Sequence, residues 1–304
     1  MRKKAKGTNT TLSQTRGKIE SLLSKNGVVI LPPMDVIVSS RLLTLLGIKA
    51  QTTMFDPWYN KGVGGERDDY VKYIVGVLNA LVAFSEHIFF WGFPEIIAHF
   101  VDKIPGTLEL RCWLTWFYKN SPSMIRGWRS AQMTCLHLSK PGAKMHVENF
   151  LNEVQLQKFK QGKLRFIPGP PSVIEEPLLC GFVGRKEQMG HPSQKPVAVL
   201  ERPILMGTTR GDLVVDLMSG AGTSAVAAYK NERFSIICDI SEEYTAMAEK
   251  RLGVRRITLP STLTGNLENL TDRLRPKKLR IPFNNGRLPA EEQSVKYRQL
   301  TLPI

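Results

Sequence analysis

Paired cysteines and long apolar runs are both absent from this chain of 304 residues. Its four cysteines, Cys112, Cys135, Cys180 and Cys238, lie far apart and form no CxxC motif, so we predict reduced thiols, an intracellular protein and no zinc or other metal site. No apolar run approaches the roughly 20 residues that cross a bilayer. The first residues, MRKKAKGTNTTLSQT, are basic and polar with no apolar stretch behind them, which argues against a secretory signal.

Acidic residues are also scarce, because 27 Asp and Glu oppose 42 Lys and Arg and leave a formal net charge of +15. Positive charge concentrates in residues 1–25, 253–304 and 111–165, the last with ten basic residues against two glutamates. Segregated positive charge suits a polyanion, and DNA or RNA fits best. Disordered basic tails that serve solubility would explain the two ends but not residues 111–165.

The glycine-bearing stretch GDLVVDLMSGAGTSAVAAYKNERFSIICD, residues 211–239, is the strongest local signal. It predicts two buried strands, 213–217 and 234–238, linked by the turn Ser219-Gly220-Ala221-Gly222 and a helix that begins at Thr223. A strand that runs through Gly-x-Gly into a helix places bare backbone N–H groups beside a ligand. Asp239 at the tip of the second strand suits the two hydroxyls of a ribose. The stretch therefore indicates a nucleotide-like cofactor.

The identity of that cofactor depends on Asp216, at the end of the first strand. The glycines alone do not exclude a nicotinamide dinucleotide, because Ala225 at the third position is tolerated in that fingerprint. A carboxylate beside the turn would repel a pyrophosphate, whereas it would attract a ligand that carries an ammonium and a sulfonium group. We therefore favour a cationic cofactor over a dinucleotide. The alternative of an ordinary βαβ turn without a ligand weakens once the other motifs are considered.

A second signal is Asp56-Pro57-Trp58-Tyr59-Asn60, which follows a predicted strand over residues 50–55. Proline fixes the backbone φ angle, so this turn can present the Asp56 carboxylate and the Pro57 carbonyl in one direction. Two acceptors next to two aromatic rings would suit a planar group that bears an exocyclic NH₂. The competing interpretation is a simple turn with a packed tryptophan.

Strands and helices alternate along the chain, which predicts an α/β fold with a largely parallel sheet. Expected strands cover residues 27–31, 50–55, 87–93 and 108–118, expected helices cover 39–46, 70–81, 94–104 and 242–252, and 134–139 is expected as a closing antiparallel strand. Residues 1–16 are expected to be disordered, with a short helix from Thr15 to Lys25. Periodicity fades over residues 141–190, which predicts an appended lobe or long loops outside the sheet.

Three blocks carry a family resemblance: DPWYN, then HPSQKPVAVLERPI, then VVDLMSGAGTSAVAA with CDISEEYTAMAEKRL. In this order they resemble the amino-group DNA methyltransferases that use S-adenosylmethionine, in the permuted subgroup whose catalytic motif precedes the cofactor motif. The matching parts span residues 27–140 and 191–252. The chain departs from the family pattern at Trp58, which replaces a second proline, at Leu217 and Met218, which replace Pro-Phe, and at Pro203 inside a predicted helix.

The resemblance implies a Rossmann-like methyltransferase fold with a mostly parallel, circularly permuted central sheet and a small irregular target-recognition region. The implied parts are a disordered basic N-terminus (1–16), a catalytic half (17–140), the target-recognition region (141–190), a cofactor-binding half (191–252) and a basic, proline-containing tail (253–304).

The resemblance also implies roles for individual residues. Asp56 and Pro57 would accept hydrogen bonds from the target amino group, Tyr59 would stack on the flipped-out base and Trp58 would pack behind it. Cofactor contacts are implied for Asp35, Ser193, Lys195, Asp216, Ser219, Gly220, Ala221, Gly222, Thr223 and Asp239. Of these, Ser193 and Lys195 would take the methionine carboxylate, and Asp35 the adenine amino group. Phosphate contacts are implied for Arg111, Lys119, Arg126, Arg129, Lys158, Lys160, Lys163 and Arg165.

The implied reaction is methyl transfer from S-adenosylmethionine to the exocyclic N6 of adenine in double-stranded DNA, because Asp rather than Ser heads the catalytic motif. Methylation of cytosine N4 or of an RNA base stays open, as does a non-catalytic nucleic-acid-binding protein on the same fold. A nicotinamide-dependent reductase ranks last. The sequence leaves open the recognition sequence, the presence of a partner restriction endonuclease, and the choice between a monomer and a homodimer.

Overall fold

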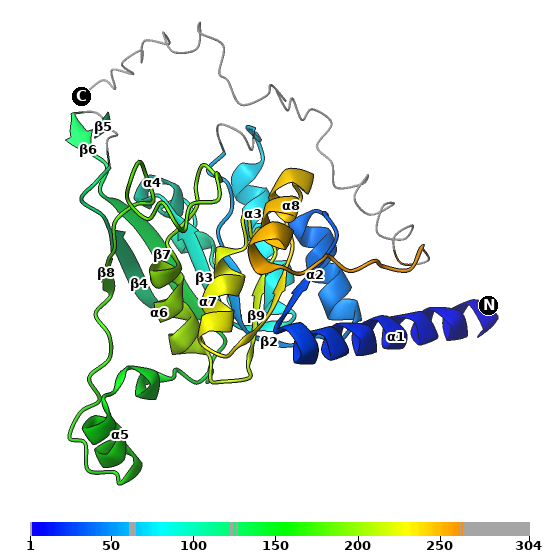
Figure 1. Ribbon diagram of the computed structural model, residues 1–304, viewed down its shortest axis with the longest axis horizontal. Helices are drawn as coiled ribbons and strands as arrows, with labels where there is room; N and C mark the ends of the chain where they lie inside the picture. The colour runs from blue at the N-terminus through cyan, green and yellow to red at the C-terminus, as the bar shows by residue number, and fades with distance from the viewer. Residues whose placement is uncertain (1, 61–64, 122–123, 126, 262, 264–304) are drawn as a thin grey trace, which may run out of the picture.

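The computed structural model describes residues 2–60, 65–121, 124–125, 127–261 and 263, and it shows helices on both faces of a central sheet (Figure 1). In this part of the chain the sheet has eight strands in the order β1-β10-β9-β2-β3-β7-β4-β8. They are β1 (Val28–Ile30), β2 (Ala50–Phe55), β3 (Ser85–Gly92), β4 (Glu109–Phe117), β7 (Gln132–Ser139), β8 (Val173–Glu175), β9 (Leu213–Asp216) and β10 (Phe234–Ile237). Neighbouring strands are parallel except where β7 lies between β3 and β4.

Each face of the sheet is covered by its own group of helices. One group comprises α1 (Arg2–Asn26), α2 (Val36–Leu45), α3 (Tyr70–Val82) and α4 (Pro94–Ile97), and the other comprises α6 (Val197–Gly207), α7 (Thr223–Lys230) and α8 (Glu242–Leu252). Successive strand residues point to opposite faces, so Met54 packs into the cluster with α6 while Phe55 packs into the cluster with α3. Apolar residues therefore fill both faces, as a parallel sheet requires.

The chain order confirms the predicted permuted α/β architecture. Strand β2 precedes β9 by more than half the chain, yet the two are parallel neighbours in the centre of the sheet. The predicted strand 50–55 and the predicted helix 242–252 match β2 and α8 at both ends.

The N-terminal segment differs from the prediction, because helix α1 runs from Arg2 to Asn26 where disorder was expected over residues 1–16. Leu12, Thr15, Ile19 and Leu23 recur at helical spacing and face the protein body, with Ile19 fully buried. The residues between these four positions are mostly polar, so the composition of the segment did not indicate a helix with a buried face.

Three other predictions need correction. The helix expected over 94–104 is interrupted, because α4 ends at Ile97 and a 3₁₀ turn follows at Val101–Lys103. The antiparallel strand does not close the sheet but lies between β3 and β4. Residues 141–190 are not wholly outside the sheet, because β8 pairs with β4 at its edge. A three-residue strand gives too weak a periodicity to be seen in the sequence.

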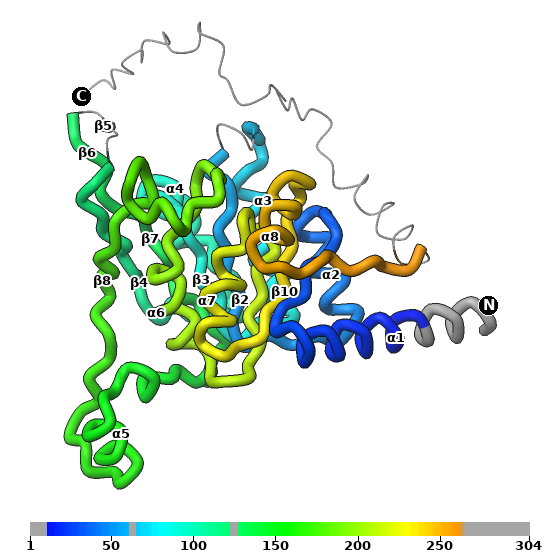
Figure 2. The backbone as a smooth tube through the Cα atoms, viewed as in Figure 1, coloured from blue at the N-terminus to red at the C-terminus, as the bar shows by residue number. Residues whose placement is uncertain are grey.

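Two smaller elements project from the body. The pair β5 (Met124–Ile125) and β6 (Trp128–Arg129) forms a separate two-stranded sheet. Helix α5 (Glu153–Lys160) has no buried residue and extends away from the sheet (Figure 2). Most of the predicted basic tail, 253–304, lies outside the described residues. Among the helices that are described, none combines the length and the apolar character that a bilayer crossing requires.

The docking of α1 can be tested by substitution. Ile19→Ala removes a fully buried side chain from the core, and we expect it to lower the free energy of unfolding by about 2–5 kcal/mol. Gln14→Ala, at an exposed position of the same helix, should change it by less than about 0.5 kcal/mol. Urea unfolding of both variants measures the difference. Equal effects would mean that α1 does not pack against the body.

Candidate active site

The two predicted motifs meet at one edge of the sheet. Strands β2 and β9 are parallel and adjacent, with Met54 opposite Asp216, so Asp56 and the glycine turn both follow the carboxyl ends of neighbouring strands. The carboxyl edge of a parallel sheet is where open α/β folds bind ligands. The two motifs therefore lie beside each other at the ends of neighbouring strands of one sheet.

The Asp56 carboxylate is held by two side chains. Its Oδ2 forms an ion pair with the Lys195 ammonium, and its Oδ1 accepts a hydrogen bond of 3.2 Å from the Tyr59 hydroxyl. Lys195 is only 5% exposed, and its ammonium lies 5.5 Å from the centre of the Trp91 ring. Burying an ammonium is costly unless a counter-charge accompanies it. Asp56 therefore supplies the charge that allows Lys195 to be buried. The family resemblance implied a cofactor contact for Lys195, and the structure places its ammonium on the Asp56 carboxylate.

The two aromatic residues of the motif lie in different surroundings. The Tyr59 ring contacts Phe93 with centroids 4.7 Å apart, and burial together with the Asp56 charge raises the pKa of Tyr59 well above its usual value. Trp58 instead packs its ring on the edge of Tyr70, 5.2 Å away, and its indole N–H donates to the Gly65 carbonyl at 3.1 Å. Tyr59 thus borders the acidic corner, while Trp58 supports it from the α3 side. Pro57 is buried between them.

Asn60 is a residue whose contribution the sequence did not reveal. Its side-chain amide donates to the Arg67 carbonyl at 3.1 Å and accepts from the Arg67 N–H at 2.7 Å. This reciprocal pair joins the two ends of the segment that follows the motif. Asn60 also has a φ of 53°, a conformation that asparagine adopts more readily than most residues. Asn60 therefore fixes the direction in which the chain leaves the turn that contains Asp56 and Pro57.

The glycine turn lies between two buried carboxylates. Desolvation raises the pKa of Asp216 to about 7, and Asp216 also accepts the Met218 N–H at 3.1 Å. Asp239 is 9% exposed, its pKa is raised by burial, and its Oδ2 accepts the Gly220 N–H at 2.8 Å. Two acids in these surroundings favour a ligand that brings positive charge or hydroxyl donors.

The bend itself needs glycine for two separate reasons. Gly220 and Gly222 have φ values of 50° and 73°, in the left-handed region. A Cβ on Gly220 would also lie 2.8 Å from His191 Nε2, so the imidazole closes over bare backbone. His191 in turn contacts Tyr244, with ring centroids 4.3 Å apart. Neither His191 nor Tyr244 was predicted as a site residue, although His191 heads the HPSQKP block.

The remaining predicted cofactor residues surround this bend. Ser219 and Ala221 belong to the turn, and Thr223 Oγ1 accepts a hydrogen bond of 2.8 Å from Arg251. Ser193 is exposed and its N–H donates to His191 Nδ1 at 3.2 Å. Asp35 caps helix α2 by accepting the Ile37 N–H and also accepts the Tyr73 hydroxyl, both at 2.8 Å. These two hydrogen bonds account for the position of Asp35 between β1 and α2.

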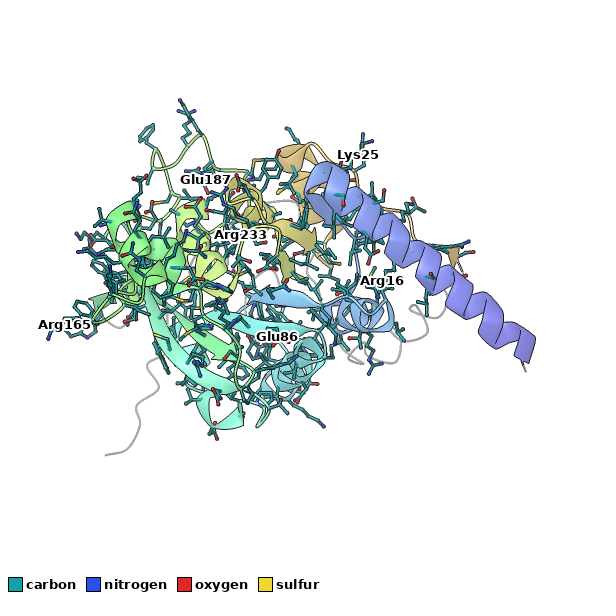
Figure 3. The ribbon with its side chains drawn as sticks, turned by 90° about the horizontal axis from the view of Figure 1, so that it is seen from below. Arg16, Lys25, Glu86, Arg165, Glu187 and Arg233 are labelled. Carbon is teal, nitrogen blue, oxygen red and sulfur yellow. The ribbon has the colours of Figure 1, made fainter. Side chains whose placement is uncertain are left out.

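The predicted phosphate contacts are not brought together. Lys119 and Arg129 follow β4 at the carboxyl edge, where Lys119 pairs with Glu175. Arg111 lies near the start of β4, and α5 with Lys158, Lys160, Lys163 and Arg165 projects from the opposite end of the sheet (Figure 1). Arg165 accordingly lies at the rim of the molecule, apart from Glu187 (Figure 3). Arg126 lies outside the described residues. The positive charge of residues 111–165 therefore forms two separate surfaces.

Comparison with known proteins agrees with this site. A mostly parallel sheet with a glycine turn and an acid-proline corner at the carboxyl ends of adjacent strands is typical of doubly wound α/β folds that bind a ligand there. The profile of the DNA methylase family N6_N4_Mtase matches residues 23–250, and the chain belongs to this family.

Individual relatives are more distant. The chain is 30% identical over 141 residues to type II methyltransferase M.HpaI of Haemophilus parainfluenzae, covering 46% of this chain and 44% of that protein. It is 30% identical over 164 residues to M1.MboII of Moraxella bovis, covering 45% of this chain and 60% of that protein. The matches thus span about half the length of these relatives. A structure of an M1.HpyAVI-SAM complex has a TM-score of 0.59 at 18% identity, over 75% of this chain and all of that one.

The Asp56–Lys195 pair can be tested by a double-mutant cycle. Asp56→Asn leaves the buried Lys195 ammonium without its counter-charge, and we expect it to lower the free energy of unfolding by about 3–5 kcal/mol. In a Lys195→Met background the same change should cost less, with a coupling energy of about 1–3 kcal/mol. The exposed pair Lys119–Glu175 is the control and should couple by less than about 1 kcal/mol. Denaturant unfolding measures both cycles, and equal coupling in the two would contradict the buried pairing.

Asp216 predicts a pH dependence of stability. The pKa of its carboxyl is about 7 in the folded protein against 3.8 as its ordinary value, so between these values the folded state binds more protons. The stabilisation that the protonated Asp216 carboxyl gives to the folded state is therefore complete below about pH 4. It is lost as the pH rises toward 7, by at most about 1.4 kcal/mol per pH unit. Asp216→Asn removes the titration. The free energy of unfolding of the wild type should fall between pH 5 and pH 7, whereas that of Asp216→Asn should not fall through this group, so the difference between the two proteins changes over this interval. Parallel pH profiles would refute the assignment.

Proposed function

We propose that this protein transfers a methyl group from S-adenosylmethionine to the exocyclic N6 of an adenine flipped out of double-stranded DNA. The observation that carries the proposal is the position of the Asp56 carboxylate, on the strand next to the one that ends in Asp216 and the glycine turn. Membership of the DNA methylase family supports the reaction class. Support for adenine comes from the aspartate that heads DPWYN and from a relative, 40% identical over 68 residues, named DNA adenine methyltransferase YhdJ of Escherichia coli.

The cofactor side of the site fits a cationic nucleoside. S-adenosylmethionine supplies a methyl group on a positively charged sulfur. Asp216 would offset positive charge at the bend, and Asp239 would accept the ribose hydroxyls. The backbone of Ser219 to Thr223 would lie against the ligand, because Gly220 and Gly222 carry no side chain there. Ser193, Lys195 and Asp35 would complete the contacts, with Lys195 divided between the ligand carboxylate and Asp56.

The target side accounts for activation of a weak nucleophile. The lone pair of a base amino nitrogen is delocalised into the ring. Hydrogen bonds from the amino group to the Asp56 carboxylate and the Pro57 carbonyl would favour a tetrahedral nitrogen and stabilise its developing positive charge. The carbon–sulfur bond breaks with its electron pair left on sulfur, a carbon–nitrogen bond forms, and the nitrogen then loses a proton to water. Tyr59 would stack on the base, with its ring positioned by Phe93.

The parts of the chain divide the work accordingly. Residues 17–140 and 191–252 would form the catalytic and cofactor halves of one domain. Within the predicted recognition region, the segment after β8 lies at the carboxyl edge, whereas α5 lies at the other end (Figure 1). Recognition of the target would therefore involve residues 119–131 and 176–190 rather than the whole of 141–190. A cognate restriction endonuclease is a proposal that the names of the type II relatives support, and the choice between a monomer and a homodimer stays a prediction.

The central role of Asp56 gives a direct test. Asp56→Asn keeps the size of the side chain but removes its charge, and we expect the single-turnover rate of methylation to fall by about 10²–10³-fold. S-adenosylmethionine affinity, measured by calorimetry, should change little. Asp102→Asn, at an exposed aspartate in the 3₁₀ turn after α4, is the matched control and should keep the full rate. Equal activity of the Asp56 variant and the wild type would remove Asp56 from its role.

The same assay identifies the modified base. DNA treated with the wild-type protein is digested to nucleosides and analysed by mass, and N6-methyladenine is the expected product. N4-methylcytosine without methyladenine would replace the proposed target within the same reaction class.

A further inference from the structure

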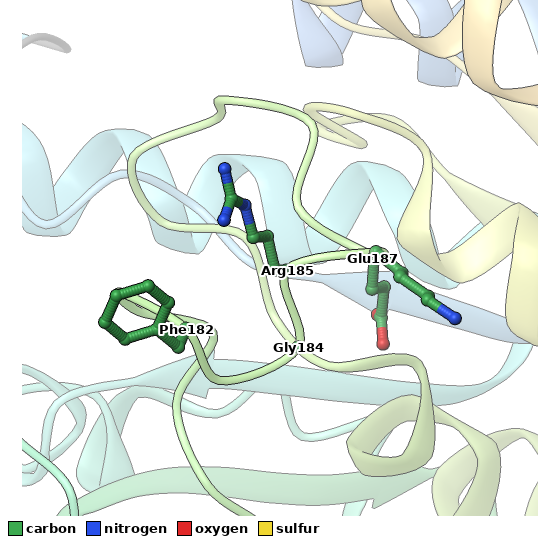
Figure 4. A pocket seen from close by; sticks show the side chains of 5 residues that line it. Phe182, Gly184, Arg185 and Glu187 are labelled. Atoms are coloured by element: carbon green, nitrogen blue, oxygen red, sulfur yellow. The ribbon is translucent and has the colours of Figure 1, made fainter.

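An exposed phenylalanine lies at the carboxyl edge of the sheet. Phe182 is 89% exposed, the highest value among the large apolar side chains that the structure describes. It belongs to the segment between β8 and α6 and points away from the protein body (Figure 4). Single exposed apolar side chains are common on protein surfaces, and Phe182 differs from them in its position at the carboxyl edge beside the exposed cations Arg185 and Lys186.

The turn that carries Phe182 is held in a defined shape. The Gln188 side-chain amide donates to the carbonyls on both sides of the phenylalanine, to Gly181 at 3.3 Å and to Val183 at 2.7 Å. Gly181 and Gly184 have φ values of 55° and 64°. These left-handed conformations favour glycine at both positions. The ring is therefore presented on a fixed turn and not on a loose loop.

This turn is connected to the catalytic corner through the HPSQKP block. Gln194 donates to the Glu187 carbonyl and accepts the Met189 N–H, both at 2.8 Å. The next residue is Lys195, whose ammonium contacts Asp56. The Glu187 carboxylate also accepts the Val197 N–H at 2.8 Å, at the start of α6. Hydrogen bonds of Gln188, Gln194 and Lys195, together with the backbone between them, thus connect the Phe182 turn to the Asp56 carboxylate.

The other end of the segment is fastened to the strand next to it. The Asn120 side chain donates to the Leu178 carbonyl at 2.9 Å and accepts the Leu178 N–H at 2.8 Å. Leu178 itself packs against the core cluster that contains Trp116 and Ile174. Both ends of the Phe182 turn are therefore tied to the sheet.

The charges around the ring suit a polyanion. Arg185 and Lys186 are exposed, and neither forms an ion pair with a described residue. Together with Phe182, Gly184 and Glu187 they line an open cavity of about 650 Å³ (Figure 4). An apolar ring flanked by two cations matches the DNA backbone and base stack, which offer phosphates on the outside and apolar faces within.

We infer that Phe182 is a positioning residue that enters the base stack of duplex DNA at the place vacated by the target base, while Arg185 and Lys186 bind the adjacent phosphates. The inference rests on the proposed function, because a methyl acceptor inside a duplex must leave the stack to reach Asp56. An aromatic ring in the vacated place restores stacking on both neighbouring bases and slows the return of the target. Phe182 does not touch the reacting atoms, and it acts by prolonging the exposure of the base.

The test compares two duplexes after methylation-aware sequencing of plasmid DNA from cells expressing the full chain has located the modified site. One oligonucleotide duplex holds the target base in its normal pair, and the other holds the same base opposite a mismatch. Moving a mismatched base out of the stack costs less free energy, so the Phe182 ring should matter less in that duplex. Single-turnover methylation rates and DNA affinities are measured for the wild type, Phe182→Ala, Phe182→Trp and Phe166→Ala. Phe166 is 75% exposed in the segment after α5 and serves as the matched control.

Phe182→Ala should slow methylation of the paired duplex by about 10–100-fold and that of the mismatched duplex by less than about 3-fold, with unchanged S-adenosylmethionine affinity. Phe182→Trp should retain most of the rate, and Phe166→Ala should match the wild type on both duplexes. Equal losses on the two duplexes, or no loss with Phe182→Ala, would overturn the inference while leaving the proposed function intact. Absence of methylation by the wild-type protein on any DNA would instead mean that the proposed function itself fails.

Discussion

The ion pair between the buried Lys195 ammonium and the Asp56 carboxylate is the interaction on which the arrangement of the site depends. It joins residues from opposite ends of the permuted chain, one after β2 and the other just before α6. An unpaired ammonium at 5% exposure would be strongly destabilising, so the two segments are held together wherever the chain folds correctly. The parallel pairing of β2 with β9 separately places Asp56 next to the carboxyl end of β9. The Asp56 carboxylate is thus positioned by a salt bridge and by a strand register.

The carboxyl edge of the sheet collects the features that the proposed chemistry needs. Two buried acids flank the glycine bend, and a tyrosine borders the carboxylate that would hold the amino group. The segment from β8 to α6 is tied into this edge by hydrogen bonds of Asn120, Gln194 and Glu187, so the proposed DNA contact of Phe182 is linked structurally to the proposed methyl-transfer site. The basic residues of α5 belong to a separate surface at the opposite end.

Much of this could be predicted from the sequence because the central strands are continuous apolar runs bounded by clear turn residues. Ala50–Phe55 ends in Asp-Pro, and Leu213–Asp216 ends before Gly-x-Gly, so both the strands and the motifs at their tips were predicted. Contacts between distant residues could not be predicted. The family resemblance implied a cofactor contact for Lys195, but its sequence position gives no sign of its ion-pair partner Asp56, which follows another strand. His191 over Gly220 was missed for the same reason. Helix α1 and strand β8 were missed because one is apolar on a narrow stripe and the other has three residues.

The most direct test of the account is a crystal structure of the full chain with sinefungin, an S-adenosylmethionine analogue that carries an amine in place of the sulfonium. The account predicts that the ligand lies along the bend from Ser219 to Thr223, with its ribose hydroxyls on Asp239 and its central amine on the side that faces Asp56. A ligand bound elsewhere, or one whose amine is separated from Asp56 by packed side chains, would contradict the claim that the two motifs form a single methyl-transfer site.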